Sequence, residues 1–240
     1  MTERGQSHVN RSASEFVIGP SSVRWDGAAL VIDINEVGVP IPLPVKGKVR
    51  VTPHGLSNRL WALDDEAKHY WGPIAPSATV EAEFAAPNIR WSGHAYLDAN
   101  EGTEPINKSS NASFVDWDWS RASLKDGSTA VIYDVRQSNS DRLLALKFSP
   151  NANSVENFQA PEKKALPKTL WRMDRSIRSD EGAPPRVIQT LEDTPFYVRS
   201  VLESSLLGEK VTSLHETLSV PKLSAMSTQL MLPWRMPRVA

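Results

Sequence analysis

The sequence contains no cysteine in its 240 residues. Disulfide bonds, thiolate nucleophiles, iron–sulfur clusters and cysteine-ligated zinc sites are therefore excluded, and a cytoplasmic location is the simplest expectation. An excess of one charge is also lacking, because 27 Lys and Arg stand against 28 Asp and Glu, a formal net charge of −1. Without a field of one sign over the molecule, we expect no nucleic-acid partner.

Long hydrophobic runs and nucleotide motifs are missing as well. No run of about 18 apolar residues occurs, and residues 1–10 lack the pattern of a signal peptide, so we expect no membrane-spanning segment. The 12 glycines form no GxGxxG or Walker pattern, and the five histidines form no HxH or HExxH pair. No cofactor and no metal site are therefore expected, and the absence of a Gly-x-Ser-x-Gly elbow argues against a serine nucleophile.

The strongest hydrophobic period in the chain is two, which is typical of half-buried antiparallel strands. It occurs in residues 29–34, 45–51, 79–84 and 143–148, and residues 198–220 indicate a further hairpin. Turn signals such as Asp26-Gly27, Asp126-Gly127 and Gly208-Glu209 separate these segments. No 15-residue stretch shows a capped amphipathic helix, although residues 195–207 come closest. An all-β barrel or sandwich is predicted.

A polar segment at residues 101–111 (EGTEPINKSSN) divides two strand-rich halves and is the predicted domain joint. Residues 149–168, rich in Asn, Pro and Lys, are expected to form a long surface loop of the second half. The closing residues 230–238 mix apolar side chains with Trp and Arg. This segment is expected either to contact a membrane surface or to pack on the barrel.

Several of the eight tryptophans lie beside acids or histidine. Most buried aromatic side chains belong to a core, but positions i and i+2 of a strand share a face. His69 and Trp71 therefore point together, as do Tyr96 and Asp98, with His94 on the face of the latter pair. A barrel lined by that face would hold these groups in one apolar cavity. The alternative for Asp98 is a turn or capping role at the end of a strand.

Such a cavity has a definite chemical use. Apolar walls raise the pKa of a carboxylic acid, which then stays protonated and can donate its proton to a weak base such as an alkene. The faces of Trp and Tyr stabilise the resulting carbocation by about 1 to 2 kcal/mol each when desolvated. His or Tyr can hold the water that attacks it. The residue set fits hydration of an apolar double bond.

Asp116 and Asp118 form a second candidate, because both lie on one face of a predicted strand. Two carboxylates that flank a sugar would suit a glycosidase. The simpler interpretation is an edge strand on which one of these carboxylates pairs with Arg121.

Several stretches in order resemble the carotenoid 1,2-hydratases (hydroxyneurosporene synthases) of phototrophic bacteria, over essentially the whole chain. They are residues 18–34 (IGPSSVRWDGAALVIDI), 69–76 (HYWGPIAP), 90–102 (RWSGHAYLDANEG), 117–122 (WDWSRA), 165–172 (ALPKTLWR), 190–200 (TLEDTPFYVRS), 211–218 (VTSLHETL) and 232–238. The resemblance implies two consecutive lipocalin-like antiparallel β-barrels, here residues 1–103 and 104–240. It also implies cofactor-independent addition of water to the terminal C1–C2 double bond of acyclic carotenoids such as neurosporene and lycopene, a hydro-lyase reaction of bacterial carotenoid biosynthesis.

The family's His-x-Trp and Tyr-x-Asp motifs fall on His69, Trp71, Tyr96 and Asp98. By resemblance, Asp98 is the proton donor to C2, Trp71 and Tyr96 line the cation at C1, and His69 or Tyr96 orients the water. Ala95 stands where relatives have Gly, a change that suits a strand. The acyclic carotenoid implies peripheral contact with the intracytoplasmic photosynthetic membrane.

The relatives carry a further aromatic-rich segment before the position of Met1. The chain is therefore expected to be shortened at its N-terminus, with an incomplete first barrel whose open strand edges admit water. Two alternatives remain for the function. One is a lipocalin-like carrier that binds a polyene without changing it, and the other is a related terpenoid cyclase or isomerase.

Overall fold

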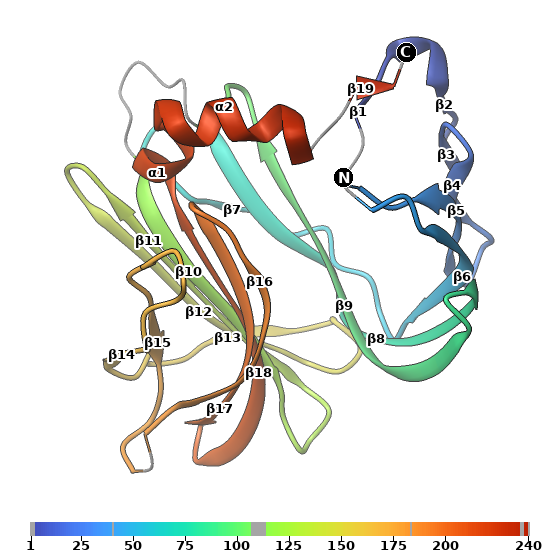
Figure 1. The fold of residues 1–240 in the computed structure, drawn as a ribbon. Coiled ribbons are helices and arrows are strands. Elements are labelled where there is room, and N and C mark those ends of the chain that lie inside the picture. The colour runs from blue at the N-terminus through green and yellow to red at the C-terminus, as the bar shows by residue number, and fades with distance from the viewer. Residues whose placement is uncertain (1–2, 40, 107–113, 183, 236–237, 240) are drawn as a thin grey trace. The chain divides into compact units, whose positions relative to one another are not determined.

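The computed structural model describes residues 3–39, 41–106, 114–182, 184–235 and 238–239 (Figure 1). The chain divides into two compact units. Unit 1 comprises residues 1–54, 77–97 and 229–240, and unit 2 comprises residues 55–76 and 98–228. The predicted barrel boundary after residue 103 stays a prediction, because residues 107–111 of the expected joint lie outside the described residues.

Strands make up most of both units, and the all-β prediction is confirmed. The elements are β1 (Glu3–Arg4), a 3-10 helix (Gln6–His8), β2 (Val9–Arg11), β3 (Glu15–Ile18), β4 (Ser21–Trp25), β5 (Leu30–Val37), β6 (Pro44–Pro53), β7 (Trp61–Ala62), β8 (His69–Ala86), β9 (Ile89–Gly102), β10 (Phe114–Ser123), β11 (Thr129–Gln137), β12 (Asp141–Phe148), β13 (Val155–Asn157), β14 (Lys163–Ala165), β15 (Ser176–Arg178), β16 (Arg186–Asp193), β17 (Tyr197–Leu206), β18 (Glu209–Ser219), α1 (Val220–Ser224), α2 (Met226–Arg235) and β19 (Arg238–Val239).

Unit 1 is built on an antiparallel meander in which β2, β3, β4, β5, β6 and β8 are neighbours in that order, and β9 pairs with β8. The predicted strands at residues 29–34, 45–51 and 79–84 lie in β5, β6 and β8. The Asp26-Gly27 turn between β4 and β5 forms because Gly27 adopts a φ of 98°. Its geometry is fixed by Asp26 Oδ1, which accepts hydrogen bonds from the backbone N–H groups of Ala28 and Ala29 at 3.0 and 2.8 Å.

Unit 2 contains a seven-stranded antiparallel sheet with the order β13-β12-β11-β10-β18-β17-β16, and β14 and β15 form a separate pair. The predicted hairpin at residues 198–220 is β17 and β18, joined by Leu207 and Gly208 at φ values of 53° and 76°. The end strands β13 and β16 do not pair with each other in the described part of the chain. The hydrogen bonds of the sheet therefore do not close it into a barrel.

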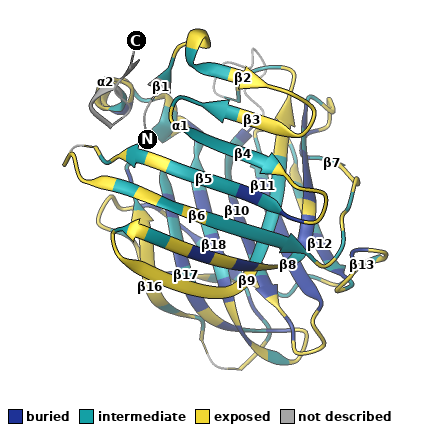
Figure 2. Ribbon diagram, turned by 90° about the vertical axis from the view of Figure 1, so that its right-hand side faces the viewer, coloured by how far each residue is buried: buried dark blue, intermediate teal, exposed yellow. Residues whose placement is uncertain are grey.

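The strands of unit 2 differ in how they are buried (Figure 2). In β11, residues 129–135 are all buried, whereas β18 alternates and buries Val211, Ser213, His215 and Thr217. This alternation directs polar side chains into the interior. In unit 1, by contrast, residues 89–94 of β9 are all exposed.

The helices α1 and α2 follow β18, and the sequence did not predict them. Conversely, residues 195–207, the segment that most resembles a helix, contain strand β17. Its burial alternates with period two, which explains why the strand form is preferred. Neither α1 nor α2 has the length and apolar content to cross a membrane, as judged from the described residues. The side chains of residues 233–238, in the C-terminal segment, lie outside the described part of the structure.

Candidate active site

The start of β8 carries two of the four predicted site residues into the interior of unit 2. His69 is 7% exposed and Trp71 is completely buried, whereas Tyr70 between them is only half-buried. This is the alternation of a strand with one buried face. Gly72, which follows, is required by close packing, because a Cβ atom there would lie 2.3 Å from the backbone oxygen of Arg59.

The structure brings Trp71 together with Asp98, near the end of β9. The indole Nε1–H of Trp71 donates a hydrogen bond to Asp98 Oδ2 at 2.7 Å. Indole can only donate, so Oδ2 acts as the acceptor. A proton on this carboxyl group in its acid form is therefore carried by Oδ1. Asp98 is half-buried while the indole behind it is closed off, so Asp98 is the member of the pair that a ligand can reach.

Trp71 belongs to a continuous group of rings in unit 2, here named the aromatic cluster. Neighbouring ring centroids lie 4.9 to 6.4 Å apart, within the range of favourable aromatic contacts. Its members, in order of contact, are Phe148, Trp61, Trp71, Tyr133, Trp117, Phe114 and His69. The cluster thus packs the rings of Trp61 and Tyr133 against the indole that donates to Asp98.

Tyr133 on β11 is a member that sequence reasoning did not find. Its ring meets the ring of Trp71 edge-on at 5.6 Å, and its side chain is 3% exposed. Burial raises the pKa of the Tyr133 phenol far above its usual range, and the negative charges of Asp98 and Glu216 raise it further. The phenol is therefore neutral at any physiological pH. The sequence signal that could have found Tyr133 is the apolar run at residues 130–133 (AVIY). The sequence does not reveal which strands pair with this run.

His69 is held by groups at both of its ring nitrogens. Nδ1 lies 2.7 Å from Asp64 Oδ2, and Nε2 lies 3.0 Å from the backbone oxygen of Glu104. Burial opposes ionisation of Asp64, but hydrogen bonds from His69 and from the backbone of Lys68 and His69 hold the pKa of its carboxyl below the usual value. Gly102 leaves room for the imidazole, since a Cβ atom there would lie 2.8 Å from His69 Cδ2. This arrangement fixes the ring in place.

The remaining predicted residues lie on the unit 1 part of β9. Tyr96 is half-buried and precedes Asp98 by two residues on the same strand. His94, which the period-two pattern placed on the same face, is exposed. The roles of His69, Trp71, Tyr96 and Asp98 in chemistry stay predictions.

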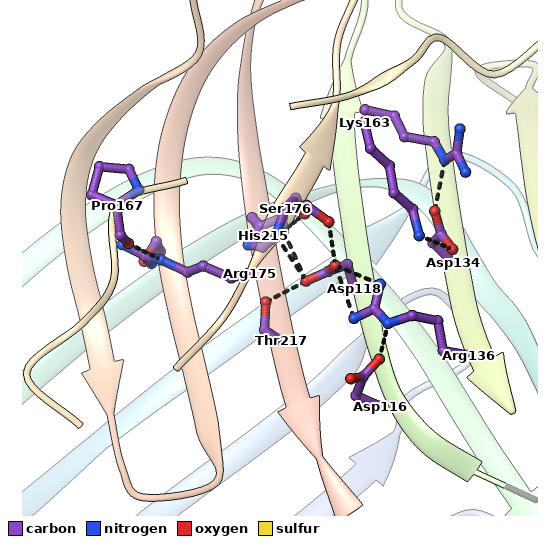
Figure 3. A network of polar contacts seen from close by, with 12 residues as sticks. Asp116, Asp118, Asp134, Arg136, Lys163, Pro167, Arg175, Ser176, His215 and Thr217 are labelled. Atoms are coloured by element: carbon purple, nitrogen blue, oxygen red, sulfur yellow. Dashed lines mark hydrogen bonds and ion pairs between the residues drawn. The ribbon is translucent and has the colours of Figure 1, made fainter. Parts of the chain in front are cut away.

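A second group of polar side chains, here named the buried polar cluster, lies inside unit 2 (Figure 3). Asp118 is 6% exposed and accepts hydrogen bonds from Ser176 Oγ at 2.7 Å and from Thr217 Oγ1 at 2.5 Å. Arg136 Nη1 lies 3.3 Å from Asp118 Oδ2, and Arg136 also pairs with Asp116. Hydroxyl groups and a guanidinium therefore surround this carboxylate.

The prediction that Asp116 or Asp118 pairs with Arg121 is wrong. Arg136 takes this place because it stands opposite Asp116 in the β10–β11 register. Arg121 lies opposite Val131 instead, and its Nη1 donates to Ser123 Oγ at 3.4 Å. The register of the β10–β11 hairpin decides the pairing, whereas the sequence interpretation used only the nearest cation along the chain.

His215 is completely buried beside Asp118. Its Nε2 donates to the backbone oxygen of Ser176 at 2.8 Å and lies 3.7 Å from Asp118 Oδ1. Its Nδ1 has no hydrogen-bond partner among the described residues. Burial lowers the pKa of the imidazole, because protonation would place a second N–H where no acceptor is found; the charge of Asp118 and the hydrogen bond to Ser176 oppose this shift.

The interior around the buried polar cluster is nearly filled. A cavity of about 10 Å³ remains beside Asp118, Ser176 and His215, which is room for one water at most. A paired-carboxylate site for a sugar, the second candidate of the sequence, does not fit this space. Within the described residues, no group of three or more His, Asp or Glu side chains is arranged to hold a metal ion.

Comparison with known proteins gives a family and a fold. The model of the family described as carotenoid hydratase CrtC matches residues 1–240. The acyclic carotenoid 1,2-hydratase of Rubrivivax gelatinosus is 54% identical over the whole chain, which covers 58% of that protein. The protein of the same name from Thiocapsa roseopersicina is 45% identical with the same coverage, and that from Cereibacter sphaeroides is 33% identical with 84% of its length covered. The chain thus spans somewhat more than half of the first two relatives.

A solved structure supports the fold alone. A Nitrosomonas europaea protein described as AttH superposes with a TM-score of 0.56 at 13% identity, covering 89% of this chain and 72% of that protein. The lipocalin-like β architecture predicted from the sequence is thereby confirmed.

Proposed function

Because this chain belongs to the carotenoid hydratase CrtC family, we propose that it adds water to the terminal C1–C2 double bond of acyclic carotenoids. The observation that carries the proposal is the hydrogen bond of 2.7 Å between Trp71 Nε1 and Asp98 Oδ2, set beside the aromatic cluster. A carboxyl group that is reachable from outside and backed by buried rings suits proton donation to an alkene.

The proposed reaction begins with the transfer of a proton from Asp98 to C2. The π electrons of the double bond form the new C2–H bond, which leaves a tertiary cation at C1 and a carboxylate at Asp98. A π face that this cation can approach stabilises it more than the neutral substrate and lowers the barrier, whereas Trp71, which is completely buried, acts through its N–H. A water then forms the C1–O bond, and the proton that it loses restores the acid form of Asp98.

Each of the predicted residues has a place in this scheme. Trp71 orients the carboxyl group through Oδ2 and leaves Oδ1 to carry the proton. Because both nitrogens of His69 already face acceptors, we assign the positioning of the water to Tyr96 and give His69 the task of joining Asp64 to the backbone at Glu104. The proposed enzyme is a hydro-lyase that uses no cofactor and meets its apolar substrate at the surface of the photosynthetic membrane.

The test is incubation of the chain with lycopene or neurosporene in lipid, followed by chromatography and mass spectrometry of the pigments. The expected product is heavier than the substrate by one water. Asp98→Asn is the matched control, because it keeps the shape of the side chain and removes the acid. A pigment that is bound but recovered unchanged would favour the carrier function, and a product of unchanged mass would favour a cyclase or isomerase.

A further inference from the structure

A turn at residues 169–172, between β14 and β15, presents two large apolar side chains to solvent. Leu170 is 89% exposed and its neighbour Trp171 is 46% exposed. Exposed apolar side chains that stand alone are common on soluble proteins. Two adjacent ones at the tip of a turn, one of them tryptophan, form a surface that gains free energy when it is removed from water.

The backbone of this turn is fixed rather than loose. Arg172 N–H donates to the oxygen of Thr169 at 2.9 Å, and Arg172 adopts a left-handed φ of 52°. From β16, Asp193 Oδ2 accepts a hydrogen bond from Leu170 N–H at 3.0 Å. The buried side chain of Met173, 1% exposed, anchors the far end. The structure thus holds the turn in a strained conformation that keeps Leu170 and Trp171 outside.

A cation of α1 reinforces the turn and adds charge to it. Lys222 Nζ donates to the backbone oxygens of Trp171 and Arg172 at 3.4 and 3.1 Å. Together with Lys168 and Arg172 it places three cations around the two apolar side chains. Asp193 is bound to the turn, and Lys168 shares its charge with Asp174 at 2.8 Å. The surroundings of the tip therefore remain positive by one charge, counted from these five groups.

We propose that residues 168–172, here named the tip, dock the protein on the surface of a membrane that contains anionic lipid. Leu170 and Trp171 enter the interfacial layer, which tryptophan favours, while Lys222 and Arg172 lie at the level of the lipid phosphates. A second copy of the chain fits this surface less well. In a symmetric contact the cations of one tip would face those of the other.

The biological sense of this docking rests on the proposed function, since an acyclic carotenoid dissolves in the bilayer. The proposed contact differs from the one considered from the sequence. For residues 230–238 membrane contact was one of two alternatives, whereas the tip belongs to the segment between β14 and β15, where the sequence indicated a long loop ending at residue 168.

The experiment is sedimentation of the full chain with vesicles of phosphatidylcholine alone and of phosphatidylcholine mixed with phosphatidylglycerol, without carotenoid. We expect binding to the mixed vesicles, weakened about fivefold for each cation removed. The double variant L170S/W171S is expected to bind at least about tenfold more weakly. The matched control is I41S/L43S, which removes two apolar side chains that are 65% and 63% exposed in unit 1 and should bind like the parent chain.

Three results would overturn the docking proposal: equal binding of L170S/W171S and the parent, an equal loss in both double variants, or a smaller oligomer of L170S/W171S in sedimentation velocity. Thermal unfolding of each variant verifies that the fold is kept. Hydration of detergent-dissolved carotenoid, measured in parallel, separates the two proposals. A chain that binds vesicles but hydrates nothing keeps the docking surface and loses the proposed function.

Discussion

Unit 2 places two carboxyl groups, those of Asp98 and Asp118, in two different surroundings. Asp98 receives a neutral indole N–H beside the aromatic cluster, to which His69 belongs. Asp118 receives two hydroxyl groups and the guanidinium of Arg136, and its neighbour His215 is closed off from solvent.

The difference shows that residue type alone does not make a catalytic acid. The groups that contact Asp118 come from β11, β15 and β18, so this residue is suited to hold those strands to β10. A carboxyl group beside π faces and open to a ligand is suited to give up a proton. The two groups can be separated by measuring activity and stability on the same variants.

The largest effect is expected for Asp98→Asn. Loss of general acid catalysis should lower the rate of carotenoid hydration by about 10³-fold, while the midpoint of thermal unfolding changes little. Product formation per folded molecule is the measurement. A variant that keeps more than about a tenth of the parent rate would contradict the role of Asp98 as the acid.

The converse result is expected for Asp118→Asn. Removing a buried charge that Arg136, Ser176 and Thr217 contact should lower the free energy of unfolding by about 3 kcal/mol. Denaturant unfolding measures this loss, and the activity per folded molecule should stay near that of the parent. The exposed pair of Asp174 with Lys168 supplies the control, since Asp174→Asn should cost less than about 1 kcal/mol. Equal losses of unfolding free energy in both variants would show that the contacts of Asp118 stabilise the fold no more than an exposed ion pair does.

Trp71→Phe tests the hydrogen bond within the aromatic cluster. It keeps an aromatic face but removes the N–H that orients Asp98, so we expect about a tenfold lower maximal rate. Trp61→Phe is the control, because it changes a ring that packs on Trp71 and leaves the Trp71–Asp98 bond in place. An equal loss of rate in both variants would rule out this explanation.

The smallest effect is the pH dependence of stability from His215. Burial lowers the pKa of this imidazole in the folded chain, so the unfolded chain binds the extra proton first as pH falls below the unfolded value of about 6.5. Stability should therefore decrease with falling pH from about 6.5, by at most about 1.4 kcal/mol for each pH unit. Denaturant midpoints between pH 5 and 7 measure it. In His215→Gln this slope should disappear, and an unchanged slope would assign the effect to another group.

Much of the fold could be predicted from local patterns. The period of two located β5, β6 and β12, and Asp26-Gly27 located a turn whose hydrogen bonds are made by adjacent residues. The helix α2 was not found, because it has only ten residues and contains Pro233, a residue that disfavours a helix interior. Closure of the sheet could not be judged, because it depends on pairing between segments far apart in the sequence.

The candidate site was found only in part for the same reason. The i, i+2 relation pairs residues within one strand, His69 with Trp71 and Tyr96 with Asp98. It says nothing about which strand lies opposite, so Tyr133 on β11 and Trp61 on β7 were missed. The pairing of Asp116 with Arg136 was missed as well, because the β10–β11 register decides it.

The contacts of Asp118 also bear on the order of events in folding. They join this residue to Ser176 and Thr217, which are 58 and 99 positions away along the chain. Contacts between such distant segments form only after loop closure has brought them together, so they belong to the late part of the folding reaction. The buried polar cluster should accordingly lower the rate constant of unfolding and have little influence on the rate constant of folding.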